Sequence, residues 1–92
     1  MVKVLIKSPC SASLIIQYGI KNWPIWEREP CNFSWIYREK EICYIIEGEA
    51  KIKTEEGESY LIKSGDWVEF PEGLSCEWQI IKSLKKHFRL GE

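Results

Sequence analysis

The stretch from Trp35 to Gly48 reads WIYREKEICYIIEG, and the stretch from Gly65 to Ile80 reads GDWVEFPEGLSCEWQI. Within the first stretch, residues 42–46 are almost continuously apolar, which is typical of a strand buried on both faces. The charged residues 38–40 predict a turn before that strand, and Pro71-Glu72-Gly73 predicts a turn within the second stretch. Both stretches therefore indicate short strands separated by tight turns.

The remainder of the chain continues this alternation of strands and turns. Gly48 predicts a turn, and residues 13–18 fit either a short strand or a helical turn. About eight to ten short strands result, which predicts an all-β fold: a single-domain, antiparallel jelly-roll β-barrel over residues 1–92. The strands are expected at residues 1–6, 26–29, 33–38, 42–46, 50–55, 60–63, 67–70, 74–81 and 84–90.

Composition and charge exclude several classes of function. Apolar residues make up 45% of the chain and include five Trp, which is enough to fill one dense core. The net charge of −1 leaves no basic field for a phosphate backbone, so we expect no nucleic-acid partner. The basic residues at 82, 85 and 86 are expected to form a solvated strand face or a solvated terminus. The longest aliphatic run near the start, residues 14–16, is far too short to span a membrane, so no membrane partner is expected.

The four cysteines are Cys10, Cys31, Cys43 and Cys76, and no two of them form a Cys-x-x-Cys pair. This spacing excludes a zinc ribbon or a thioredoxin-like motif. The start of the chain lacks the pattern of a secretory signal peptide. We therefore expect reduced thiols and a cytoplasmic location.

The two opening stretches resemble the two signature motifs of the cupin superfamily. In that family the first motif has a His-x-His pair followed by Glu and Gly, and the second has Gly, Pro-x-Gly and a final His. The residues that match family positions are Glu41, Gly48, Gly65, Pro71 and Gly73. The positions of the three histidines are held here by Trp35, Tyr37 and Cys76. The resemblance implies a cupin-type jelly roll that has lost its usual metal site, so no metal and no cofactor are expected.

Among cupins, the chain looks like the small single-domain group related to ureidoglycine aminohydrolase. The resemblance is carried by residues 23–27 (WPIWE), 43–48 (CYIIEG), 65–68 (GDWV), 70–73 (FPEG) and 76–78 (CEW). It implies a compact barrel with a central pocket, often assembled as a dimer, so we expect a homodimer. The aminohydrolases themselves have two barrels and need a metal. This chain departs from them because it has one barrel and no histidine at the motif positions.

Strand parity selects the side chains that would meet in such a pocket. Residues two apart in a strand face the same side, and the resemblance implies that the motif faces meet inside the barrel. The expected substrate-binding residues are Trp26, Trp35, Cys43 and Trp78, with Phe70 at the rim.

The catalytic candidates are Glu41, Tyr37 and Cys76. A buried carboxylate needs a partner, and Tyr37 is the expected donor to Glu41. That pair either transfers protons or forms a structural hydrogen bond that closes the end of the barrel. Cys76 is either a nucleophile or a buried thiol that packs as a small apolar residue. The Trp side chains either fill the core or form aromatic walls for a flat or sugar-like ligand.

Three functions are consistent with these residues. The first is a metal-independent enzyme that acts on a small-molecule ligand, such as a ureide, a sugar derivative or a carboxylic acid. The second is a non-catalytic binding or sensor module, and the third is an accessory dimer with a filled barrel. An enzyme requires an open pocket in which Glu41 and Cys76 both reach solvent. A sensor requires an open and mainly aromatic pocket, whereas a filled barrel has no cavity.

Overall fold

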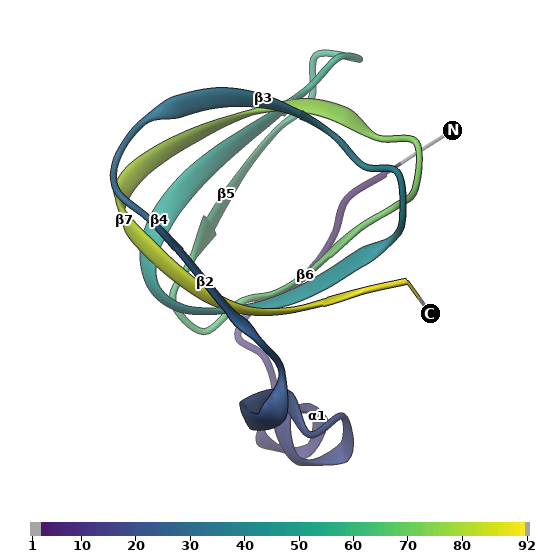
Figure 1. Cartoon of the computed structure of the whole chain (residues 1–92), viewed down its shortest axis with the longest axis vertical. Coiled ribbons are helices and arrows are strands. Elements are labelled where there is room, and N and C mark those ends of the chain that lie inside the picture. The colour runs from purple at the N-terminus through teal and green to yellow at the C-terminus, as the bar shows by residue number, and fades with distance from the viewer. Residues whose placement is uncertain (1–2, 92) are drawn as a thin grey trace.

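The computed structural model describes residues 3–91, and its regular structure is mostly antiparallel strand (Figure 1). The described part of the chain contains seven strands, one short α-helix and one 3-10 helix. In chain order these are β1 (Leu5–Lys7), α1 (Ala12–Gln17), η1 (Ile20–Asn22), β2 (Ile25–Arg28), β3 (Asn32–Ile36), β4 (Glu41–Thr54), β5 (Ser59–Lys63), β6 (Trp67–Phe70) and β7 (Ser75–Leu90).

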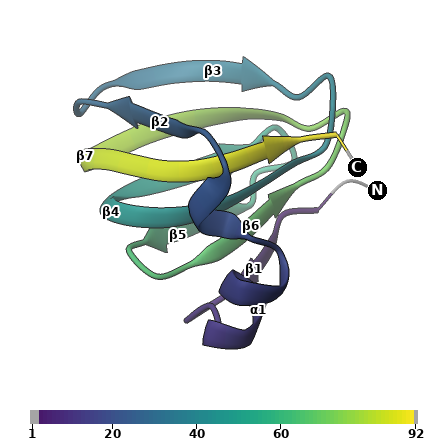
Figure 2. The same ribbon diagram turned by 60° about the horizontal axis from the view of Figure 1, so that its bottom comes forward.

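Two long strands organise the sheet. β4 and β7 pair with each other along almost their whole lengths, and each also pairs with two shorter strands. β5 and β6 pair with β4, β2 and β3 pair with β7, and β1 pairs with β6. The sheet curls so that β3 lies across the interior from β6, as Figures 1 and 2 show. The predicted all-β antiparallel jelly roll is confirmed.

β4 differs from its prediction because Gly48 does not make a turn. The sequence predicted separate strands at 42–46 and 50–55, but residues 41–54 form one strand. Register shifts against β7 lie between Ile45 and Ala50, so the strand accommodates the glycine as a bulge. A Cβ at Gly48 would lie 2.2 Å from the Ser83 carbonyl oxygen, and its φ is +94°. The glycine therefore permits close approach of two strands rather than a reversal of the chain.

The other differences from the predicted elements have simple causes. The two strands predicted at 74–81 and 84–90 are one strand, β7, which pairs with different partners along its length. Because β4 and β7 each replace two predicted strands, the described part of the chain has seven strands, fewer than the eight to ten predicted. Residues 13–18, left open between strand and helix, fall mostly in α1, which Ser11 caps through its hydroxyl. The strand predicted at 1–6 is shorter and later than expected: β1 covers Leu5–Lys7, residues 3–4 are not in a strand, and residues 1–2 lie outside the described part of the chain.

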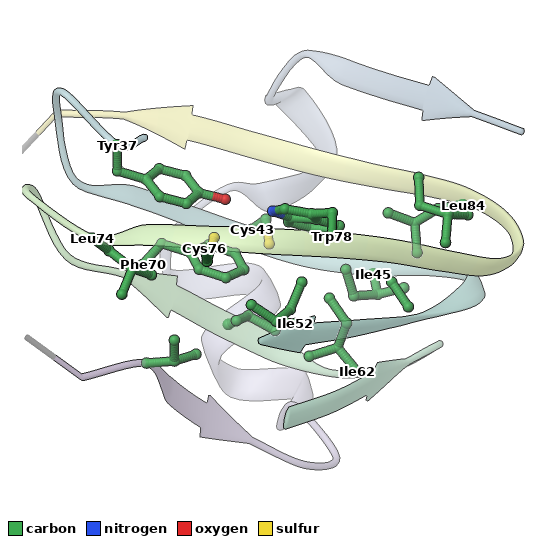
Figure 3. Close-up of a cluster of buried hydrophobic side chains, with 14 residues drawn as sticks. Tyr37, Cys43, Ile45, Ile52, Ile62, Phe70, Leu74, Cys76, Trp78 and Leu84 are labelled. Carbon is green, nitrogen blue, oxygen red and sulfur yellow. The ribbon is translucent and has the colours of Figure 1, made fainter. Parts of the chain in front are cut away.

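The core is a cluster of aliphatic and aromatic side chains from the inner faces of the strands (Figure 3). Ile45, Ile52 and Ile62 are fully buried at one end of it. Tyr37 and Phe70 lie toward the other end, and Trp78 lies between the two groups (Figure 3). Tyr37 and Trp78 also line the cavity described below. Phe70 was expected at a pocket rim, but it is fully buried, with its ring stacked on Tyr37 at 4.8 Å between centroids.

Candidate functional site

An open cavity of about 610 Å³ is bounded by β2, β3, β4, β7 and the turn after β3. Its volume falls in the range of small-molecule sites, roughly 300–1,000 Å³. It exists because β2 and β3 both pair with β7 at different positions and not with each other, which leaves one side of the roll open. The lining residues are Trp26, Arg28, Phe33, Ser34, Trp35, Ile36, Tyr37, Arg38, Glu39, Glu41, Trp78, Lys86, Phe88 and Leu90.

A buried ion pair forms part of the cavity wall. The Lys86 Nζ donates to Glu41 Oε2 at 2.5 Å, and both side chains are more than nine-tenths buried. Glu41 begins β4 and Lys86 belongs to β7, so the pair bridges the two central strands. The sequence analysis was wrong on two points here. Lys86 is not on a solvated face, and the partner of Glu41 is Lys86 rather than Tyr37.

Two indole rings enclose the ammonium group of this pair. Lys86 Nζ lies 4.9 Å from the ring centroid of Trp26 and 4.8 Å from that of Trp78. Trp26 is directly opposite Lys86 in the β2–β7 pairing. Cation–π attraction and the Glu41 carboxylate therefore compensate the lysine for its lost hydration.

Tyr37 lies deep in the cavity wall and is 3% exposed. Its hydroxyl points toward the indole nitrogen of Trp78 (Figure 3). Burial raises the pKa of the Tyr37 hydroxyl far above its ordinary value, and the nearby Glu41 carboxylate raises it further. Tyr37 therefore keeps its proton and acts as an O–H donor.

The second oxygen of Glu41 faces the cavity. Only Oε2 has a protein donor among residues 3–91. Within that range every fully buried side-chain nitrogen or oxygen has a hydrogen-bond partner. Because Oε1 has none, it is accessible to solvent. A bound molecule can thus meet a carboxylate oxygen from Glu41 beside a hydroxyl donor from Tyr37.

The remaining predicted residues divide between the cavity and the core. Trp26, Trp35 and Trp78 line the cavity, with Trp35 half exposed at its mouth. Cys43, expected to bind substrate, is buried in the core and does not line the cavity. Of the two residues that an enzyme was expected to present to solvent in the pocket, Glu41 lines the cavity and Cys76 does not, so any chemistry here proceeds without the Cys76 thiol. Burial raises the pKa of the Cys76 thiol to about 11, with Glu41 raising it further, and burial raises that of Cys43 to about 12. Both thiols are therefore protonated near neutral pH.

Sequence reasoning missed several residues of the cavity lining, among them Lys86, Phe33 and Arg28. Strand parity contained a signal for Lys86, because Leu84 and Phe88 lie two residues to either side of it and share its face. A lysine flanked in this way is directed inward. Phe33 lies two residues before Trp35 on β3, and its ring stacks on Trp78 with 5.8 Å between centroids. His87 belongs to the opposite face of β7, where Nδ1 lies 3.0 Å from the Trp23 carbonyl oxygen.

The cavity does not fit the divalent metal that cupins usually hold. The carboxylate at the family's ligand position, Glu41, is engaged by the Lys86 ammonium. Across residues 3–91, no three His, Cys, Asp or Glu side chains gather closely enough to hold a metal ion. Zinc and iron sites require at least three such donors. The Lys86 ammonium, which is itself positively charged, lies beside the Glu41 carboxylate, in the place where a metal ion would need further ligands.

Comparison with known proteins agrees with this architecture. Residues 17–88 match the family model described as the EutQ-like cupin domain. The chain belongs to the EutQ-like cupin family. Its fold is the all-β cupin jelly roll, and the predicted cupin resemblance is confirmed at this level. No curated protein matches the chain at a significant level.

Two solved structures illustrate the range of similarity within this cupin group. A DUF861 family protein from Thermotoga maritima is 38% identical, with a TM-score of 0.89, and the match covers 98% of this chain and 99% of that one. A putative ethanolamine utilization protein Q from Salmonella typhimurium is 27% identical, with a TM-score of 0.67 over 73% of this chain. The match spans about half, 54%, of the Salmonella protein. Among the described residues of this cupin, no helix is long and apolar enough to cross a membrane.

Proposed function

We propose that this cupin is a metal-independent enzyme that binds a small polar metabolite in its cavity and transfers protons through Glu41. The observation that carries the proposal is the buried Glu41–Lys86 pair in the wall of an open cavity. A general acid or base must be held rigidly and must reach the bound molecule. Glu41 meets both conditions, because Lys86 fixes one oxygen and the other faces the cavity.

Tyr37 provides the second proton-transfer group in this proposal. Because burial raises its pKa, the hydroxyl keeps its proton near neutral pH and can donate a hydrogen bond to a bound oxygen along which a proton moves during the reaction. Cys76 lies behind these residues, and its protonated thiol suits packing better than nucleophilic attack. The proposal therefore assigns proton transfer to Glu41 and Tyr37 and a supporting role to Cys76.

The aromatic side chains supply the binding surface. Trp26, Trp35 and Trp78 come from three different strands and line one cavity. Flat faces of this kind bind planar or sugar-like molecules through burial of apolar area, while a few polar groups set the orientation. The resemblance to the ureidoglycine aminohydrolase group extends the candidate metabolites to ureides, sugar derivatives and carboxylic acids.

A second candidate is a binding or sensor module without turnover. Lys86 is held by Glu41 and by both indoles, which suits a rigid recognition surface as well as a reactive one. The two candidates share the ligand and the cavity and differ only in product formation. We further propose a homodimer located in the cytoplasm, which follows the pattern of the small cupins.

Indole NMR signals test the site directly, because each of the five Trp residues gives one N–H resonance. Titration of a metabolite library should shift the resonances of Trp26, Trp35 and Trp78. Trp23 and Trp67 pack together outside the cavity, with 6.3 Å between their ring centroids, and their resonances should not shift. A library that leaves all three cavity signals unchanged would contradict a small-molecule site.

Turnover of the bound metabolite separates the enzyme from the sensor. Glu41→Gln should lower the rate by roughly 10²–10⁴-fold, the usual contribution of a positioned acid or base. Glu49→Gln is the matched control, because Glu49 also pairs with a β7 lysine but lies outside the cavity. Tyr37→Phe keeps the stacked ring and removes only the hydroxyl. Binding without product would favour the sensor, and full activity in Glu41→Gln would refute the proposed role.

A further inference from the structure

One wall of the cavity is a cluster of three aromatic rings, Trp26, Phe33 and Trp78, that contacts two cations. The Arg28 guanidinium lies 4.6 Å from the ring centroid of Phe33, and Phe33 stacks on Trp78 with an interplanar angle of 8°. Trp78 in turn faces the Lys86 ammonium, which also contacts Trp26, and the two indole centroids lie 6.3 Å apart. The cluster therefore holds two positive charges against three ring faces.

Only one of the two positive charges in this cluster is neutralised by an ion pair. Lys86 is paired with Glu41, whereas no carboxylate lies within ion-pair distance of Arg28 in the part of the chain that the structure describes. The acidic neighbours of Arg28 in sequence, Glu27 and Glu29, do not line the cavity. Strand alternation explains why Glu27 does not line the cavity. Trp26 and Arg28 lie on the inner face of β2, and Glu27, between them, lies on the opposite face.

The second pair of charged lining residues lies at the opposite end of β3. Arg38 and Glu39 belong to the turn after that strand, and both line the cavity. Their charges are opposite and they are neighbours in sequence, but no ion pair joins them among residues 3–91. The lining as a whole carries three basic and two acidic side chains, an excess of one positive charge in a chain of net charge −1. Among the described residues, Arg28 is the unpaired cation that also contacts the aromatic cluster.

We propose that the ligand of this cavity is a small planar organic monoanion, an aromatic or conjugated carboxylate whose charged group binds Arg28. The proposal rests on the proposed small-molecule function and names its ligand class. A guanidinium presents two parallel N–H donors to a carboxylate, and contact with the Phe33 ring holds it in orientation. A flat ligand body then covers the exposed indole of Trp35 and reaches toward Glu41 and Tyr37.

Three probes of equal ring size test the ligand class: benzoate, benzamide and benzylammonium. Binding to the full chain is followed by the indole signals of Trp26, Trp35 and Trp78 in NMR titrations. We expect benzoate to bind more tightly than benzamide, and benzylammonium to bind least. Benzamide or benzylammonium binding as tightly as benzoate would overturn the anion assignment while leaving a small-molecule site in place.

Variants of Arg28 test the assignment of the charged group. Arg28→Met should weaken benzoate binding by about tenfold or more, the usual effect of losing a charge-assisted hydrogen bond. Arg28→Lys keeps the positive charge but loses the two parallel N–H donors of the guanidinium. Its affinity for benzoate should therefore lie between those of the unchanged protein and Arg28→Met. Arg89→Met is the control, because Arg89 belongs to β7 but does not line the cavity. Unchanged benzoate affinity in Arg28→Met would overturn the inference.

The wider metabolite library separates failure of this inference from failure of the proposed function. If benzoate does not bind but a cationic or neutral metabolite shifts the cavity indoles, the monoanion is wrong and the site stands. If neither the three probes nor any library member shifts these indoles, both proposals fail. Unshifted Trp23 and Trp67 signals report in each case that the fold is intact.

Discussion

Two Glu–Lys pairs join the same two strands, β4 and β7, in opposite environments. Glu41 and Lys86 approach to 2.5 Å with 8% and 7% of their side chains exposed. Glu49 and Lys82 approach to 3.5 Å with 32% and 69% exposed. The residue types and the strands are identical, so the difference lies in the surroundings. The exposed pair is an ordinary surface contact, whereas the buried pair forms part of the cavity wall.

The bulge at Gly48 separates these two environments. Before it, the buried residues of β4 are Glu41, Cys43 and Ile45, at odd positions. After it they are at even positions, starting with Ala50. Without the shift in register, Glu49 would share the inward face of Glu41, because residues an even number apart in a strand face the same side. One glycine therefore places one acidic residue inside and the other outside.

Breaking the inner pair should have the largest effect on stability. Lys86→Met leaves the Glu41 carboxylate buried without a partner and should lower the free energy of unfolding by about 3–5 kcal/mol. Urea unfolding followed by Trp fluorescence measures the change. Glu41→Gln combined with Lys86→Met removes both charges and should recover most of the loss. If the double variant is no more stable than Lys86→Met, the cost does not come from an uncompensated charge.

The sequence predicted the fold better than it predicted this pair. Strand and turn patterns located most of the seven strands, because alternation and Gly or Pro turns are local signals. Merging of residues 41–54 into one strand was missed, because Gly48 fits both a turn and a bulge and only the approach of Ser83 decides between them. The location of Lys86 depends on β2 closing over it, which is a contact between distant segments.

Gly48→Ala should have the next largest effect, because it acts on the feature that separates the two pairs. The added Cβ would lie 2.2 Å from the Ser83 carbonyl oxygen, and the backbone has a φ of +94°. We expect a loss of about 2–3 kcal/mol in the free energy of unfolding, in the range found for strained backbone positions. Urea unfolding measures this loss as well.

Gly57→Ala is the matched control for the Gly48 variant. Gly57 has a similar φ, +89°, but no atom lies within 4 Å of the position that an added Cβ would take, so only the backbone strain remains. Gly57→Ala should therefore cost less than Gly48→Ala. Equal losses in the two variants would mean that the close approach to β7 contributes nothing, and that the bulge is held by other contacts.

The outer pair should have the smallest effect. Glu49→Gln should change the free energy of unfolding by less than about 1 kcal/mol, because exposed ion pairs are weakened by solvent and by salt. At about 1 M salt the Debye length falls to about 3 Å, so even this small difference should shrink. The Lys86→Met loss should persist at the same salt concentration, since its cause is burial rather than a screened attraction. A Glu49→Gln loss as large and as salt-resistant as that of Lys86→Met would show that burial does not distinguish the two pairs.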